Sequence, residues 1–252
     1  HHDTGRLACR SFASLFCQIK EPHFFNFDYG GRRFGWLARF EKLFARIEDR
    51  RCAIAEASTS YLYSRAAVPA IMRYTEQPKF IVTIRNPVDM APSLHSQMLI
   101  NAVEDVEEFQ SAWRLQRVRA YGDKVPKQCQ DPQMLQYKDI CRLGAQLARL
   151  YECAPAEQIL VLQLDAINQA PRAEYRRMLA FLGLSDDARE HFGTHNPAKK
   201  RRFPELWNAI QWSNRAISAM GVPPVHLGFT EFMKNTLHRD QPRPPLSEHM
   251  RK

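Results

Sequence analysis

A positive charge and a short polar turn follow the clearest strand-like run in the chain. Residues 79–84 read Lys-Phe-Ile-Val-Thr-Ile, and Arg85, Asn86 and Pro87 come directly after them. Ligands of parallel sheets bind beyond the carboxyl ends of the strands, and helix N-termini attract anions. Arg85 supplies a permanently charged planar donor at that edge, and Ser93, about two turns into the following helix, can face the same anion. The pattern indicates a phosphate site.

A structural role for Arg85 is an equally good interpretation of the residues alone. An arginine at a strand end can pair with a surface carboxylate, and Asp89 stands close by in the sequence. Pro92 removes a backbone donor next to Ser93, and we expect it to kink the helix at that point.

The elements that must position these residues alternate between strands and helices. We expect a strand over 79–84 that is buried on both faces and a second buried strand over 158–164, because both runs are apolar and unbroken. The alternation predicts an α/β fold with a central, mostly parallel sheet flanked by helices. Helices are predicted over 38–47, 61–75 with a bend at Pro69, 87–100, 106–121, 134–151, and 170–182 with an end at Gly183.

The composition excludes several classes of protein. With 252 residues, 44% hydrophobic and 25% charged, the chain predicts one domain over 1–252 that ends in a proline-rich tail at 239–252. No apolar run reaches the roughly 18–20 residues that cross a bilayer, so no transmembrane segment is expected. The six cysteines form no C-x-x-C pair, which gives no zinc pattern and favours a cytoplasmic protein without a metal. The net charge of +9 favours an acidic partner.

Four motifs stand in a fixed order along the chain. Residues 20–25 read Lys-Glu-Pro-His-Phe-Phe, residues 56–62 read Glu-Ala-Ser-Thr-Ser-Tyr-Leu, Arg85-Asn86-Pro87 precedes Ser93, and Asn196 precedes Lys199 by three residues. Together they resemble the KEPHFF segment, the GEASxxYL segment, the 3′-phosphate motif and the nucleotide loop of bacterial and heparan-type sulfotransferases. The similarity extends over about residues 19–203.

The resemblance implies a fold related to P-loop nucleotide kinases and a defined reaction. The co-substrate would be 3′-phosphoadenosine 5′-phosphosulfate (PAPS), and the product 3′,5′-bisphosphoadenosine (PAP). Sulfonate would pass by in-line transfer to a hydroxyl or amine, with no metal involved. The acceptor stays open among carbohydrates, lipids, polyketides, peptides and other small molecules.

The implied chemistry needs a base for the acceptor proton and cations around the sulfonate. Glu21 matches the position proposed as the general base in heparan-type members, and Lys20 beside it would steady the developing charge. His23 is the rival base. Structural alternatives are a solvated Glu21–Lys20 pair and a histidine that only lines the pocket.

The resemblance also places a loop over the nucleotide. Asn196, Lys199 and Arg202 match approximately the loop that closes over the adenosine and the phosphosulfate. A solvated basic face is the alternative interpretation, because residues 199–202 read Lys-Lys-Arg-Arg.

One family element is not matched. A phosphosulfate loop of the form Lys-x-Gly-Thr-Thr should precede the KEPHFF segment, but among residues 1–11 only Thr4 and Gly5 echo it. Either this segment is truncated or the loop has been lost, and truncation is expected because Glu21, Arg85 and Ser93 are retained. If the loop has been lost, the alternative function is a non-catalytic module that binds a nucleotide or a partner. A nucleic-acid-binding protein is a weaker rival, since no recognised nucleic-acid motif accompanies the positive charge.

Overall fold

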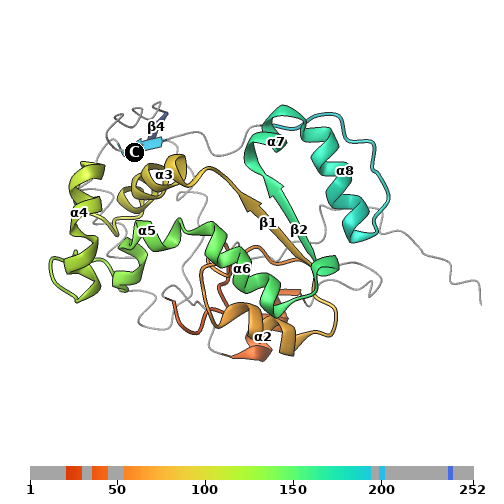
Figure 1. The fold of residues 1–252 in the computed structure, drawn as a ribbon, viewed down its shortest axis with the longest axis horizontal. Helices are drawn as coiled ribbons and strands as arrows, with labels where there is room; N and C mark the ends of the chain where they lie inside the picture. The colour runs from red at the N-terminus through yellow and green to blue at the C-terminus, as the bar shows by residue number, and fades with distance from the viewer. Residues whose placement is uncertain (1–20, 30–35, 45–53, 194–198, 202–237, 241–252) are drawn as a thin grey trace, which may run out of the picture. The chain divides into compact units, whose positions relative to one another are not determined.

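The computed structural model describes residues 21–29, 36–44, 54–193, 199–201 and 238–240 (Figure 1). Segment 1–11 and most of the tail at 239–252 lie outside these residues. The described chain separates into two compact units. The first comprises the described residues up to Asn86 and those from Arg142 to Gly193, and the second comprises Pro87–Cys141 with 199–201 and 238–240.

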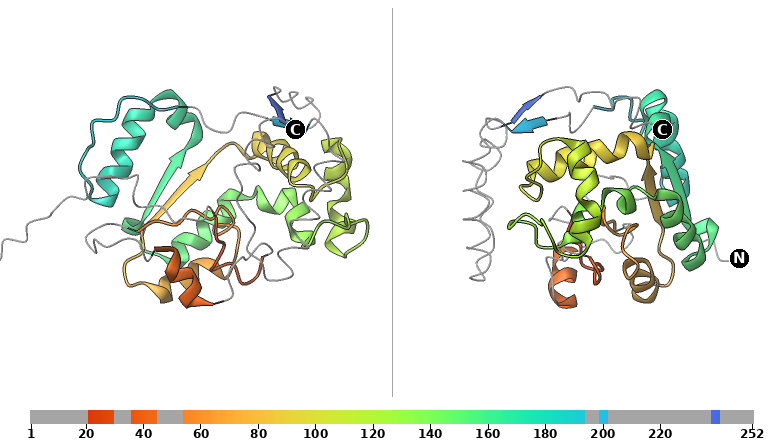
Figure 2. Two further views of the ribbon diagram at one scale, coloured as in Figure 1. Left: turned by 180° about the vertical axis from the view of Figure 1, so that it is seen from behind. Right: turned by 60° about the vertical axis from the view of Figure 1, so that its left-hand side comes forward.

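The first unit contains a pair of parallel strands. β1 (Phe80–Ile84) pairs with β2 (Ile159–Gln163), and the register runs from Phe80 opposite Ile159 to Ile84 opposite Gln163. Figures 1 and 2 show the two strands side by side from opposite directions. Both predicted strands and their parallel pairing are therefore confirmed, and their carboxyl ends lie at one edge.

The prediction that both faces of β1 are buried is wrong. Burial alternates along this strand, and Ile81 is 37% exposed. Successive side chains of a strand point to opposite faces. Within the part of the chain that the structure describes, the face that carries Ile81 is only partly covered.

Helices pack around the strands of the first unit. α2 (Ala67–Tyr74) packs against α6 (Leu143–Cys153) around a core of Val68, Leu150, Ala154 and Ile159. α8 (Pro171–Leu182) packs beside β2 and ends at Gly183, whose φ of 72° is the left-handed value that glycine adopts freely. This helix end was predicted correctly. The remaining helical segments of the unit are α1 (Leu37–Glu41), η2 (Lys42–Phe44), η4 (Ala156–Gln158) and α7 (Leu164–Gln169).

The helix predicted over 61–75 starts later than expected. Residues 59–63 form turns, and the hydroxyl of Ser64 accepts hydrogen bonds from the N–H groups of Ala66 and Ala67, at 3.2 and 3.0 Å. Pro69 is consequently the third residue of α2. Its missing N–H falls in the first turn, where no intrahelical acceptor exists, so the expected bend has no cause.

The second unit is built from helices and a short strand pair. α3 (Pro87–Ile100) begins at the proline, as predicted, and continues through Pro92. The strands β3 (Lys199–Arg201) and β4 (His238–Asp240) pair antiparallel. The other elements are α4 (Phe109–Ala120), η3 (Pro132–Leu135) and α5 (Tyr137–Ile140), packed around Met98, Val103, Ala112, Leu135 and Tyr137.

The single helix predicted over 134–151 is three separate elements, η3, α5 and α6. The side-chain oxygen of Gln116 accepts the N–H of Lys138 at 2.7 Å, and the Gln136 amide donates to the Gln116 carbonyl at 3.0 Å. These tertiary hydrogen bonds replace helical ones at the break between η3 and α5.

A buried ion pair lies inside the second unit. Arg119 donates to both carboxylate oxygens of Glu104, at 2.5 and 2.8 Å, and the Tyr137 hydroxyl donates to the same carboxylate at 2.6 Å. The backbone N–H groups of Asp105 and Val106 complete the set, each at 2.9 Å. Glu104 is thus a fully hydrogen-bonded anion within the core.

No helix in the described ranges is long and apolar enough to cross a membrane.

Candidate active site

The segment that begins at Glu21 has an unusual backbone. Glu21 and His23 have φ values of 55° and 52°, in the left-handed region that costs non-glycine residues free energy. Phe24 and Phe25, which follow directly, are buried in an aromatic cluster in which the ring of Phe24 stacks on Phe40 with centroids 4.4 Å apart. Burial of these rings anchors the segment and can offset its backbone strain.

The imidazole of His23 joins two segments of the first unit. Its Nδ1 lies 2.8 Å from the hydroxyl of Ser60, and its backbone N–H donates to the hydroxyl of Ser58 at 2.8 Å. Its Nε2 lies 3.6 Å from Oε2 of Glu21. The Glu21 side chain is 30% exposed and that of His23 is 15% exposed. Both candidate bases therefore lie together, with the carboxylate nearer the solvent.

A second carboxyl, that of Glu56, is connected to this pair through Ser58. Ser58 donates its hydroxyl to Oε1 of Glu56. Burial raises the pKa of Glu56, and the hydrogen bonds from Ser58 and Tyr61 offset that shift only in part. Burial and the nearby Glu56 charge raise the pKa of Tyr61. Polar contacts thus lead from Glu21 through His23 and Ser58 to Glu56, a partly buried acid.

Sequence reasoning did not assign a role to Glu56, Ser58 or Ser60. They entered only as part of the segment 56–62, which resembles a family motif. No local signal singled them out, because the contacts of the serines with His23 join segments 35 and 37 residues apart. The structure brings all three into the network around His23.

Arg85 and Ser93 belong to different compact units. Arg85 is half-buried directly after β1, and no carboxylate among the described residues forms an ion pair with it. Asp89, the alternative partner, belongs to the second unit, and its pairing with Arg85 also stays a prediction. Ser93 is half-buried in α3. Their joint binding of a phosphate remains a prediction.

Three of the predicted site residues, Lys20, Asn196 and Arg202, lie outside the described residues. Lys199 opens β3 and its backbone pairs opposite Asp240. Residues 199–201, predicted as part of a basic loop, are instead a strand, because the pairing with 238–240 comes from a distant segment that the local sequence does not reveal.

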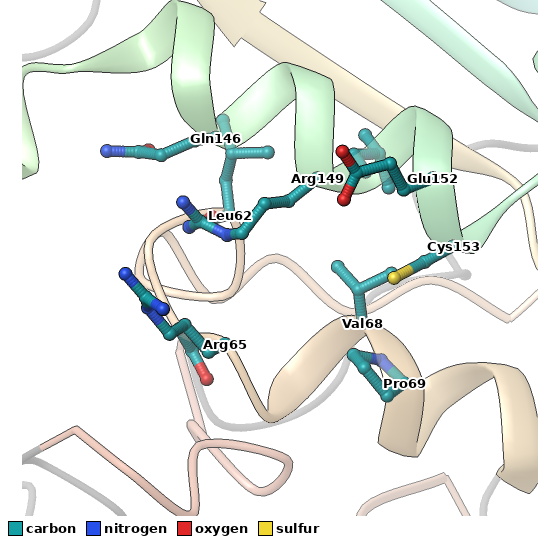
Figure 3. Close-up of a pocket in the computed structure, with 10 residues that line it drawn as sticks. Leu62, Arg65, Val68, Pro69, Gln146, Arg149, Glu152 and Cys153 are labelled. Carbon is teal, nitrogen blue, oxygen red and sulfur yellow. Dashed lines mark hydrogen bonds between the residues drawn. The ribbon is translucent and has the colours of Figure 1, made fainter.

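A small cavity lies in the first unit. It measures about 90 Å³ and is formed between the start of α2 and α6 (Figure 3). Arg149 reaches across from α6 and donates to the carbonyls of Leu62 at 3.3 Å and Tyr63 at 3.0 Å. The arginine thereby holds the end of the turn in place. The cavity is lined by Leu62, Ser64, Arg65, Val68, Pro69, Gln146, Arg149, Leu150, Glu152 and Cys153.

Comparison with known proteins supports the fold. No family model matches the chain, and no curated protein sequence matches it. Among solved structures, 16 chains match. One is a sulfotransferase from Alicyclobacillus acidocaldarius, with a TM-score of 0.58 and 22% identity over 70% of this chain and 75% of that chain. The chain therefore has a sulfotransferase-like fold that combines helices with a parallel sheet, whereas the relation to P-loop kinases remains a prediction.

Proposed function

We propose that this protein is a sulfotransferase that transfers the sulfonate of PAPS to a hydroxyl or amine acceptor. The observation that carries the proposal is the Glu21–His23 pair, a partly exposed carboxylate beside an imidazole that two serines hold. A carboxylate in this setting can take the proton from the hydroxyl or amine that receives the sulfonate. The sulfotransferase-like fold supports the same reaction class.

In the proposed reaction, the acceptor oxygen or nitrogen attacks sulfur while the bond from sulfur to the 5′-phosphate oxygen breaks. The acceptor proton passes to Glu21, and PAP leaves with the bonding pair. Lys20 would stabilise the negative charge that develops around the sulfonate. The imidazole of His23, next to the carboxylate, positions it.

The nucleotide would be held by the residues that the sequence singled out. Arg85, which has no carboxylate partner among the described residues, is available for the 3′-phosphate, and Ser93 would add a hydroxyl. Asn196, Lys199 and Arg202 would close over the adenosine and the phosphosulfate. Because the transfer needs only these cations and a base, we propose that no metal takes part.

The test separates transfer from binding. Glu21→Gln keeps the shape of the side chain but removes its basicity, so turnover with radiolabelled PAPS and a panel of hydroxyl and amine acceptors should fall by about 10²–10⁴-fold. Affinity for PAP, measured by calorimetry, should stay within about threefold. Glu76→Gln, an exposed change in the same unit, is the matched control and should alter neither.

His23→Asn tests the rival base. If His23→Asn abolishes turnover while Glu21→Gln leaves it near wild type, the histidine carries the proton and our assignment of Glu21 is wrong. If both variants lose PAP binding as well, the segment has only a structural role.

A second function has a distinct experimental outcome. It is the alternative that the sequence left open, a module that binds PAP without transferring sulfonate. PAP binding together with no labelled product from any acceptor would favour that function.

A further inference from the structure

The two nitrogens of the His23 ring face different partners. Nδ1 lies 2.8 Å from the Ser60 hydroxyl, and Nε2 lies 3.6 Å from a carboxylate oxygen of Glu21. A neutral imidazole carries one proton, so one nitrogen donates and the other accepts. Which nitrogen holds the proton decides what His23 can do for Glu21.

Electrostatic interactions favour one of the two tautomers of His23 over the other. With the proton on Nδ1, the lone pair of Nε2 would face the negative Glu21 oxygen, which is repulsive. With the proton on Nε2, an N–H dipole faces that oxygen, and Nδ1 is left to accept the hydroxyl proton of Ser60. The second arrangement satisfies both contacts with attractive interactions.

Ser60 is equipped to supply that proton, whereas Ser58 is not. Ser60 is 8% exposed, and its hydroxyl contacts the His23 ring. The Ser58 hydroxyl donates to Glu56 and accepts the backbone N–H of His23, so its proton is already committed. Only one of the two serines that touch His23 is therefore placed to act on its ring.

We infer that Ser60 is a positioning residue that fixes His23 in the Nε2–H tautomer and thereby aims an N–H at the carboxylate of Glu21. In this tautomer Nε2 has no free lone pair, so neutral His23 cannot take the acceptor proton at that atom. The Glu21 carboxylate beside that N–H then serves as the base. The inference rests on the proposed function for its catalytic consequence, but the tautomer itself can be measured without turnover.

The first measurement is the nitrogen NMR spectrum of the imidazole in the full chain, at a pH where the ring is neutral. The wild-type ring should show the Nε2–H pattern. Ser60→Ala should convert it to a mixture of tautomers, and Ser60→Thr, which keeps the hydroxyl, should restore it. Ser58→Ala is the matched control, because it removes a contact to the backbone of His23 and should leave the ring pattern unchanged.

The second measurement is turnover. Ser60→Ala should lower turnover by about tenfold, the equivalent of one ordinary hydrogen bond, with PAP affinity unchanged, and Ser60→Thr should recover it. A wild-type Nδ1–H pattern, or a ring that Ser60→Ala leaves unaltered, overturns the inference. Tautomer loss without any change in turnover overturns its catalytic part. If no acceptor is sulfonated by the wild type, the proposed function fails, and the spectrum still decides the role of Ser60.

Discussion

Glu104 in the second unit and Glu56 in the first both lie in hydrogen-bond networks, yet their pKa values move in opposite directions. Burial alone raises the pKa of each carboxyl. At Glu104, hydrogen bonds from Arg119, Tyr137 and the backbone outweigh burial and lower the pKa. At Glu56, the hydroxyls of Ser58 and Tyr61 do not outweigh it, and the pKa stays raised.

The two networks also differ in whether solvent reaches them, which distinguishes a structural network from a candidate active site. Every oxygen of Glu104 is satisfied by a cation, a phenol or a backbone N–H, and Arg119 is fully buried. The network around His23 instead ends in a carboxylate, Glu21, that solvent reaches. A saturated network holds a fold in place, whereas one that ends in a partly exposed acid can exchange a proton with a ligand.

The largest effect is expected from Arg119→Met. The change removes the cation but keeps an apolar side chain of similar length, which leaves Glu104 charged and buried without its main partner. The free energy of unfolding should fall by about 3–5 kcal/mol, as measured by chemical denaturation. Arg117→Met, an exposed change on the same helix, should stay within about 0.5 kcal/mol. Equal small losses for both variants would contradict the structural role of the pair.

Arg85→Ala asks whether a cation of the first unit serves a ligand rather than the fold. Binding of PAP should weaken by about 1.5–3 kcal/mol, the range for a charge-assisted hydrogen bond, while 5′-AMP binding hardly changes because that ligand lacks the 3′-phosphate. Calorimetry with both nucleotides measures this, and Arg73→Ala is an exposed control in the same unit. Equal losses for the two nucleotides would refute the assignment.

The two glutamates should also give opposite pH dependences. The lowered pKa of Glu104 stabilises the fold above the ordinary glutamate value of about 4.3, and this contribution disappears as the pH falls through the folded pKa. The raised pKa of Glu56 contributes below that value and is lost as the pH rises through the folded pKa. Denaturation of wild type, Glu104→Gln and Glu56→Gln across pH 3–8 measures both differences. Parallel curves for the two variants would remove the distinction between the networks.

The smallest effect is expected at an exposed pair. Arg177 lies 2.6 Å from Glu174 on α8, about as close as Arg119 lies to Glu104, but the arginine side chain is 54% exposed. Arg177→Ala should cost only about 0.2–0.5 kcal/mol in denaturation experiments, because water screens the pair. A loss close to that of Arg119→Met would show that distance, rather than burial, sets the contribution of these ion pairs.

The helices and strands that were predicted correctly are each marked by residues within the element or next to it. The apolar runs of β1 and β2, the proline that opens α3 and the glycine that ends α8 are each visible within a few residues. The break between η3 and α5 was not predictable, because it depends on Gln116, which lies 20 and 22 residues from its partners. Helical periodicity carries no information about such contacts.

The residues of the candidate site likewise fall into those that the sequence could identify and those that it could not. Glu21, His23 and Arg85 could be selected from residue type and a resemblance between motifs. The serines that hold His23 could not, since they lie 35 and 37 residues away and their role depends on tertiary folding.

The left-handed backbone of Glu21 and His23 has a consequence for how this protein can change over generations. Glycine would adopt both φ values without strain, whereas each present side chain costs about 1–3 kcal/mol there. Glu21 also precedes a proline, which further restricts its backbone. Selection for stability alone would therefore favour glycine at both positions, at the expense of a carboxylate and an imidazole. A thermostabilising screen of this protein should yield glycine at 21 and 23, in variants that have exchanged activity for robustness.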